Sequence, residues 1–200
     1  AMIIESGNPV HSLAESDKFR AAMRAAELTV VIDVVHTETT EQADWILPAS
    51  SQYEKAEATF FGANFPVNTF HLRQAILEPL EGTLAEPEIH SRLVQASGVL
   101  DGINFEPLRE AAKQGLDAFA EAFMAAAMEN PAISAYGAVV LYETLGKSLP
   151  KEKEGAAVLW FSCQMAAQKY PKQIRAAGYD GDGPQLGNAL FQAIIDSDDG

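Results

Sequence analysis

Cysteine, long apolar runs and basic residues are all scarce in this 200-residue sequence. Its single cysteine, Cys163, excludes an internal disulfide and any metal or iron–sulfur site built from cysteines of this chain. Cys163 lies in the apolar run 159–163, which favours a buried structural thiol over a reactive one. No apolar run approaches the ~20 residues that a membrane-spanning helix needs, and no signal peptide is visible.

Acidic residues outnumber basic ones, with 28 Asp and Glu against 14 Lys and Arg, and the formal net charge is −14. This balance argues against nucleic acid or an anionic membrane as the main partner. It does not exclude a phosphate ligand, because backbone amides at a helix start bind phosphate without a basic surface. The chain is 48% hydrophobic and 21% charged, as in an ordinary globular protein. Because no signal peptide is visible, we expect a cytoplasmic location.

The most informative stretch begins with the β-branched run 28–32, which predicts a buried parallel strand ending at Asp33. Residues 37–41 combine hydroxyl and acidic side chains, as at the start of a short helix, and residues 43–48 predict another strand. An earlier strand at residues 2–4 and a helix at 14–26 complete a β–turn–helix–β unit with the usual right-handed crossover. In such units ligands bind beyond the carboxyl ends of the strands.

Three residues at these strand ends are candidate ligand contacts. Asp33 could accept hydrogen bonds from a nucleotide's ribose or base, although an acid here could also cap the next helix or face solvent. Asn8, in the turn Gly7-Asn8-Pro9, is either an amide contact beside Asp33 or simply a turn residue. Thr37 predicts a capping hydroxyl, either alone or at a helix start that meets phosphate.

A longer pattern links these positions. Its residues are Asp33-x-x-x-Thr37-Glu38-Thr39, then 43–49 (ADWILPA), then Glu54-Lys55. This pattern resembles a signature of the molybdopterin oxidoreductases, which reads roughly D-x-x-x-T-E-T-A, A-D-V-V-L-P-A, E-K-E-G-T. Ser6-Gly7-Asn8-Pro9 matches an upstream N-P of that family. These enzymes include formate dehydrogenases, periplasmic nitrate reductases and dimethyl sulfoxide reductases, and the resemblance covers about residues 3–98.

The resemblance implies a bis-molybdopterin guanine dinucleotide cofactor of molybdenum or tungsten. Relatives use the position of Asp33 for the guanine dinucleotide and carry a cofactor-contacting asparagine at the position of Asn8. Lys55 matches a lysine that reaches the cofactor, although a solvated lysine is the usual fate of this residue type. Glu86 stands near an aspartate of the relatives and is a further candidate.

The resemblance also implies that the chain is one middle domain of a longer oxidoreductase, similar to formate dehydrogenase. That parent would act on a small-molecule substrate and an electron acceptor, and its remaining domains would be partners of this one. Any iron–sulfur cluster and the metal's own ligand would lie outside these residues. We expect the 200 residues alone to be catalytically inactive.

The predicted fold is a three-layer α/β domain over residues 2–102, with a doubly wound, mostly parallel, Rossmann-like sheet, followed by a helical subdomain over residues 103–200. Apolar periodicity predicts helices at 87–98, 106–129, 132–146, 156–170 and 185–196.

Two other functions stay open on sequence grounds, a stand-alone nucleotide-binding module and a protein-interaction module that uses residues 103–200. The first lacks the G-x-G-x-x-G loop of dinucleotide-binding folds. The second would be favoured by an exposed apolar stripe on residues 106–129. The four histidines show no zinc-ligand spacing.

Overall fold

The computed structural model describes residues 1–58, 70 and 72–197. Three short strands form a parallel sheet in the order β1-β2-β3, and two shorter ones form an antiparallel pair. The strands are β1 (Met2–Glu5), β2 (Thr29–Asp33), β3 (Trp45–Pro48), β4 (Glu57–Ala58) and β5 (Leu72–Arg73). The three predicted parallel strands are therefore confirmed.

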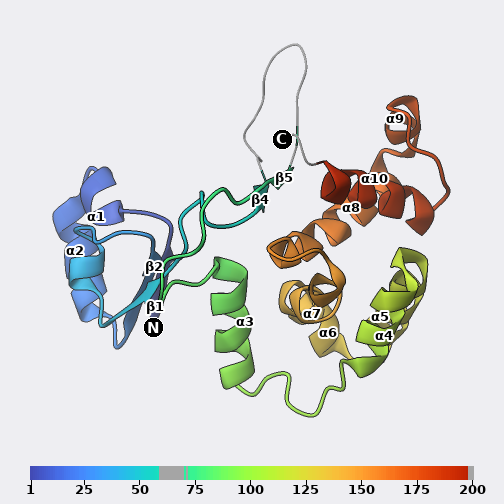
Figure 1. Cartoon of the computed structure of the whole chain (residues 1–200). Coiled ribbons are helices and arrows are strands. Elements are labelled where there is room, and N and C mark those ends of the chain that lie inside the picture. Colours follow the sequence, from blue (N-terminus) through green and yellow to red (C-terminus); the bar gives the residue numbers. More distant parts are fainter. Residues whose placement is uncertain (59–69, 71, 198–200) are drawn as a thin grey trace.

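Helices cover both faces of the parallel sheet because successive side chains of β2 point in opposite directions. Val31 packs with Met23 of α2 (Ser16–Ala25), beside α1 (Pro9–Ser12), whereas Ile32 packs with Ile89 of α3 (Glu86–Ala96). Figure 1 shows α1 and α2 on one side of the strands and α3 on the other. A mixed α/β architecture is confirmed. The strand order contains no reversal, so a doubly wound sheet stays a prediction.

The remainder of the described chain is helical and has its own core. An edge-to-face cluster lies at its centre, with the ring of Trp160 at 5.3 Å from Phe119 and 5.5 Å from Phe123. Its helices are α4 (Glu106–Gln114), α5 (Leu116–Glu129), α6 (Pro131–Ala135), α7 (Gly137–Glu143), α8 (Ala157–Lys169), α9 (Pro171–Ala176) and α10 (Pro184–Asp196), with the 3₁₀ turns η2 (Gly146–Ser148) and η3 (Glu154–Ala156). A further 3₁₀ turn, η1 (Thr40–Gln42), lies between β2 and β3.

Cys163 lies in this helical core with an exposed fraction of 3%. Burial disfavours the thiolate and raises the pKa of the thiol to about 12. The prediction of a buried thiol is confirmed. Separately, within residues 1–58, 70 and 72–197 no helix has the length and apolar character needed to cross a membrane.

Several helix predictions need correction. The single helix expected over 106–129 is wrong, because Gly115 adopts φ +120° and separates α4 from α5, which pack against each other. The helix expected over 132–146 is likewise broken, at Tyr136. The helix expected over 156–170 is confirmed, because α8 ends at Lys169; Pro171 then begins the additional short helix α9, at a position where a helix needs no N–H donor.

Helix α3 links the sheet to the helical core. The Ser91 hydroxyl donates to Glu143 of α7 at 2.6 Å, and the Tyr142 hydroxyl donates to Glu88 at 2.7 Å. Burial, and then this bond to a carboxylate, raises the pKa of Tyr142, so the phenol stays protonated. The boundary expected near residue 102 stays a prediction, since α3 belongs to the first segment and contacts the second.

Candidate functional site

The three parallel strands end together, and their carboxyl ends define one edge of the sheet. The register pairs Glu5 with Ile32 and Asp33 with Pro48, so the chain leaves each strand at the same level. The Ser6 amide continues the ladder to the Ile32 carbonyl at 3.0 Å. This carboxyl edge therefore gathers the segments after β1, β2 and β3, which carry four of the five predicted site residues.

Ser6 is the first residue beyond β1 and has φ +51°, in the left-handed region that side chains other than glycine rarely adopt. Such a conformation costs on the order of 1–3 kcal/mol and is retained where the surroundings fix it. Ser6 also lines a pocket of about 300 Å³ at this edge. This backbone conformation changes the direction of the chain between β1 and Asn8.

Asn8 joins the segment after β1 to the segment after β2. Its side-chain amide donates to Glu38 at 2.7 Å, and its carbonyl oxygen accepts from the Thr39 hydroxyl at 2.7 Å. The same Thr39 oxygen accepts from the Val10 amide at 3.1 Å, and Thr39 is fully buried. The Asn8 amide is thus held in one orientation by groups on both segments.

Glu38 is an exposed carboxylate whose ionised form is favoured. The hydrogen bond from Asn8 lowers the pKa of Glu38, with smaller contributions from a backbone amide and from His11, whose ring nitrogen lies at 3.4 Å. The carboxyl edge therefore carries a fixed negative charge beside Asn8.

Asp33 is the last residue of β2, and it lies between the chain leaving β1 and the chain leaving β3. One carboxylate oxygen accepts from the following Val34 amide at 2.7 Å. The second oxygen has no hydrogen-bond partner among residues 1–58, 70 and 72–197, and the side chain is half-buried. Asp33 can therefore accept hydrogen bonds from a ligand at the carboxyl edge.

Thr37 caps the turn η1, as its residue type predicts. Its hydroxyl accepts from the Thr40 amide at 3.2 Å, and the Thr40 hydroxyl in return accepts from the Thr37 amide at 2.7 Å. The expected α-helix is only a three-residue 3₁₀ turn. Few peptide dipoles align in so short a turn, and a contact of Thr37 with the cofactor stays a prediction beside its capping role.

Lys55 and Glu86, two of the predicted residues, form an ion pair with each other. Their side chains are 13% and 17% exposed, so solvent screens the pair less than a surface salt bridge. Glu86 also opens α3, where a negative charge is favourable. Both residues line the same pocket as Ser6, between the carboxyl edge and the start of α8.

Glu54 fixes the loop that presents Lys55. Its carboxylate accepts from the Ser51 amide at 2.6 Å and from the Leu80 amide at 2.9 Å. The Ser51 amide is the main reason that the pKa of Glu54 lies below its ordinary value. The sequence carries a signal for this loop, because Ser51-x-x-Glu54 has the spacing of a capping box.

Other contacts at this edge were not predicted from sequence. His90 of α3 lies 2.8 Å from the Glu5 carboxylate, and Thr39 holds Asn8, but neither pair shares a local pattern. Counting Glu5, Asp33, Glu38 and Glu86 against Lys55, the charges of the carboxyl edge are predominantly negative. The edge is suited to hydrogen-bond donors such as ribose hydroxyls and base amino groups rather than to bare phosphates.

Comparison with known proteins finds similarity in the N-terminal part of the chain. Residues 1–79 match the sequence model of the family described as molybdopterin oxidoreductase. A "Probable oxidoreductase YyaE" of Bacillus subtilis (strain 168) is 32% identical over 56 residues, which are 28% of this chain and 8% of that protein. The resemblance inferred from the sequence is confirmed for these residues, and the aligned segment spans under a tenth of the relative's length.

Proposed function

Since residues 1–79 match the molybdopterin oxidoreductase family, we propose that this chain binds a guanine dinucleotide arm of a molybdenum or tungsten bis-pterin cofactor. In this proposal the chain is a cofactor-binding part of a longer, formate dehydrogenase-like oxidoreductase. The three parallel strands would belong to a larger doubly wound, Rossmann-like sheet, with residues 2–102 as the binding domain. Residues 103–200 would form a helical subdomain beside it.

The observation that carries the proposal is the free carboxylate oxygen of Asp33 at the carboxyl edge, inside the residues that match the family. The Watson–Crick edge of guanine presents N1–H and an amino group, and ribose presents hydroxyls. A half-buried carboxylate is a strong acceptor for such donors. The fit is to the nucleoside, because Lys55 is already paired with Glu86 and offers little charge to phosphate.

The roles of the chain's own residues are positional. Asp33 would accept from the guanine or the ribose, and Asn8, held by Glu38 and Thr39, would orient the adjoining turn. Thr37 would keep that turn in shape, whereas Lys55 and Glu86 would line the pocket and exchange partners when a charged group enters. When bound, the cofactor would supply the two-electron redox chemistry, and the protein would supply orientation and electrostatics.

Calorimetry on this chain tests the role of Asp33. Guanosine should bind weakly, and Asp33→Asn should weaken that binding by about 10- to 100-fold, since a charge-assisted hydrogen bond contributes on the order of 1.5–3 kcal/mol. Asp17→Asn, an exposed aspartate on α2, is the matched control and should leave affinity unchanged. Equal guanosine affinity in wild type and Asp33→Asn would contradict the assignment.

A stand-alone nucleotide-binding module is the second candidate, favoured by the same free carboxylate and by the small pocket lined by Ser6 and Lys55. Selectivity separates the two proposals. A guanine-specific site should reject adenosine, whose Watson–Crick edge presents an acceptor at N1 where guanine presents a donor. Equal binding of guanosine and adenosine would favour a general nucleotide module.

A further inference from the structure

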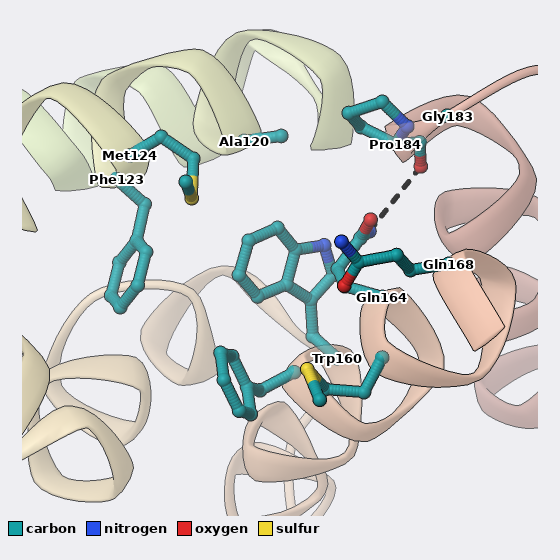
Figure 2. Close-up of a pocket in the computed structure, with 10 residues that line it drawn as sticks. Ala120, Phe123, Met124, Trp160, Gln164, Gln168, Gly183 and Pro184 are labelled. Atoms are coloured by element: carbon teal, nitrogen blue, oxygen red, sulfur yellow. Dashed lines mark hydrogen bonds between the residues drawn. The ribbon is translucent and has the colours of Figure 1, made fainter.

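A second pocket, of about 380 Å³, lies among α5, α8 and the start of α10 and shares no residue with the carboxyl edge (Figure 2). Its inner wall includes Trp160 and Phe123, which are only 2% and 5% exposed. The volume falls within the ~300–1,000 Å³ of small-molecule sites. The pocket thus has a packed inner wall and enough room for a small molecule.

The mouth of this pocket carries large apolar side chains that face solvent. Met124, Phe161 and Met165 all line it, with exposed fractions of 57%, 53% and 51%. Apolar side chains exposed together around a hollow mark an interaction site more often than isolated ones do. Methionine side chains are flexible and polarizable, so two of the three can adjust around a flat ring.

Polar groups in the pocket are few and uncharged. The described lining contains no ionisable residue, and its polar side chains are the amides of Gln164 and Gln168. Gln164 is occupied, since its amide nitrogen donates to Asn188 at 2.7 Å and to the Pro184 carbonyl at 3.3 Å. Gln168 has no hydrogen-bond partner within residues 1–58, 70 and 72–197, and Figure 2 shows it among the side chains that line the pocket.

A buried network holds the inner wall in place. The Trp160 indole N–H donates to the Asn188 carbonyl oxygen at 2.9 Å, and the Asn188 amide donates to Asp117 of α5 at 2.7 Å. Gln164 packs so closely against α10 that a Cβ at Gly187 would lie 2.6 Å from its amide oxygen. A pocket fixed in this way needs little ordering when a ligand enters.

We propose that this pocket binds a small, neutral aromatic molecule that carries one hydrogen-bonding group. Its ring would lie against Trp160 between the Met124 and Met165 thioethers, and its polar group would meet Gln168. A charged ligand is disfavoured because the described lining offers no counter-charge. An aromatic ligand is favoured because aromatic rings and thioethers both make specific contacts with it. This site is independent of the proposed cofactor function.

The probe is N-phenyl-1-naphthylamine, a neutral aromatic amine that fluoresces strongly in apolar surroundings. The chain has two tryptophans, and Trp45 is 66% exposed, so Trp45→Phe leaves Trp160 as the sole tryptophan with little risk to folding. In that background we expect saturable probe emission with matching quenching of Trp160, and a Kd of about 100 µM or tighter for a ligand of this size. Absence of saturable binding would overturn the proposal.

Substitutions at exposed positions test whether the probe binds in this pocket. Circular dichroism checks that each variant folds. Met124→Glu should weaken probe binding by about 10-fold or more, because it places a charge at the mouth. Gln168→Leu should weaken it about three- to tenfold through loss of a hydrogen bond. Met128→Glu, one turn along α5 and 82% exposed, lies outside the pocket and should change affinity by less than about twofold.

Two results would overturn the proposal in favour of another explanation. Equal weakening by Met124→Glu and Met128→Glu would mean that the probe adheres to a general apolar surface. Self-association that rises with protein concentration, disappears in Met124→Glu and competes with the probe would mean that a second copy of the chain covers the mouth.

Discussion

Replacing the Thr39 hydroxyl tests whether the carboxyl edge is held as the structure describes. Thr39→Val keeps the shape of a fully buried side chain but removes the acceptor of the Val10 amide and the donor to Asn8. Val10 is itself buried, so its amide would be left unpaired at about 1–3 kcal/mol. The half-exposed Asn8 carbonyl oxygen can hydrogen-bond to water instead, and burial of the added methyl group stabilises the fold by about 0.8 kcal/mol. A net destabilisation of about 1 kcal/mol follows.

Urea unfolding followed by far-ultraviolet circular dichroism measures this loss. With an m value of about 2 kcal/mol per molar, the midpoint should fall by about 0.5 M with the slope unchanged. Ser97→Ala is the control, since the exposed Ser97 hydroxyl donates only to the Val94 carbonyl at the end of α3, and its loss should cost about 0.5 kcal/mol or less. If Thr39→Val loses no more stability than Ser97→Ala, the proposed hydrogen-bonded link between the two segments is refuted.

Other predictions concern packing and ionisation elsewhere in the chain. Gly146→Ala would bring a Cβ within 2.7 Å of a backbone carbonyl oxygen and should destabilise by about 1–3 kcal/mol in urea unfolding, whereas Gly137→Ala meets nothing within 4 Å and should be neutral or slightly stabilising. Because the pKa of Glu54 is lowered in the folded state, its ionised carboxylate should stabilise the fold above pH 4.5, and this stabilisation should be lost as the pH falls through the folded-state pKa. Glu54→Gln should therefore flatten the pH dependence of the urea midpoint in that acidic range. An unchanged pH dependence of the urea midpoint would contradict this role of Glu54. Cys163 should resist a thiol reagent at pH 8 until urea unfolds the chain, and rapid modification of the native form would contradict its burial.

The sequence predicted the parallel strands because their signals are local. The β-branched run at 28–32, followed by Asp33, and the largely apolar stretch at 43–48, closed by Pro48, specify both the elements and their common carboxyl edge. The placement of Asn8, Asp33 and Thr37 near that edge followed from chain order alone. The capping role of Thr37 was likewise local, since it depends on residues three positions away.

What the sequence did not predict depends on contacts between distant residues or on single backbone angles. Lys55 and Glu86 were considered separately, yet they are 31 residues apart in sequence and pair in space. The division of 106–129 into two helices depends on φ at Gly115, because the apolar periodicity continues across it. Lys153 belongs to a residue type that usually faces solvent, yet it is 6% exposed and donates to the Ile195 carbonyl of α10 at 2.6 Å.

The most direct test of the central claim is a cofactor analysis of the natural protein that contains these residues, purified in its native form. Molybdenum and tungsten would be measured by mass spectrometry, and guanine nucleotide would be quantified after mild acid release. Stoichiometric metal with about two guanines per chain is the predicted result for a bis-pterin dinucleotide cofactor. A protein that folds and accumulates normally but contains neither metal nor guanine nucleotide would contradict the account.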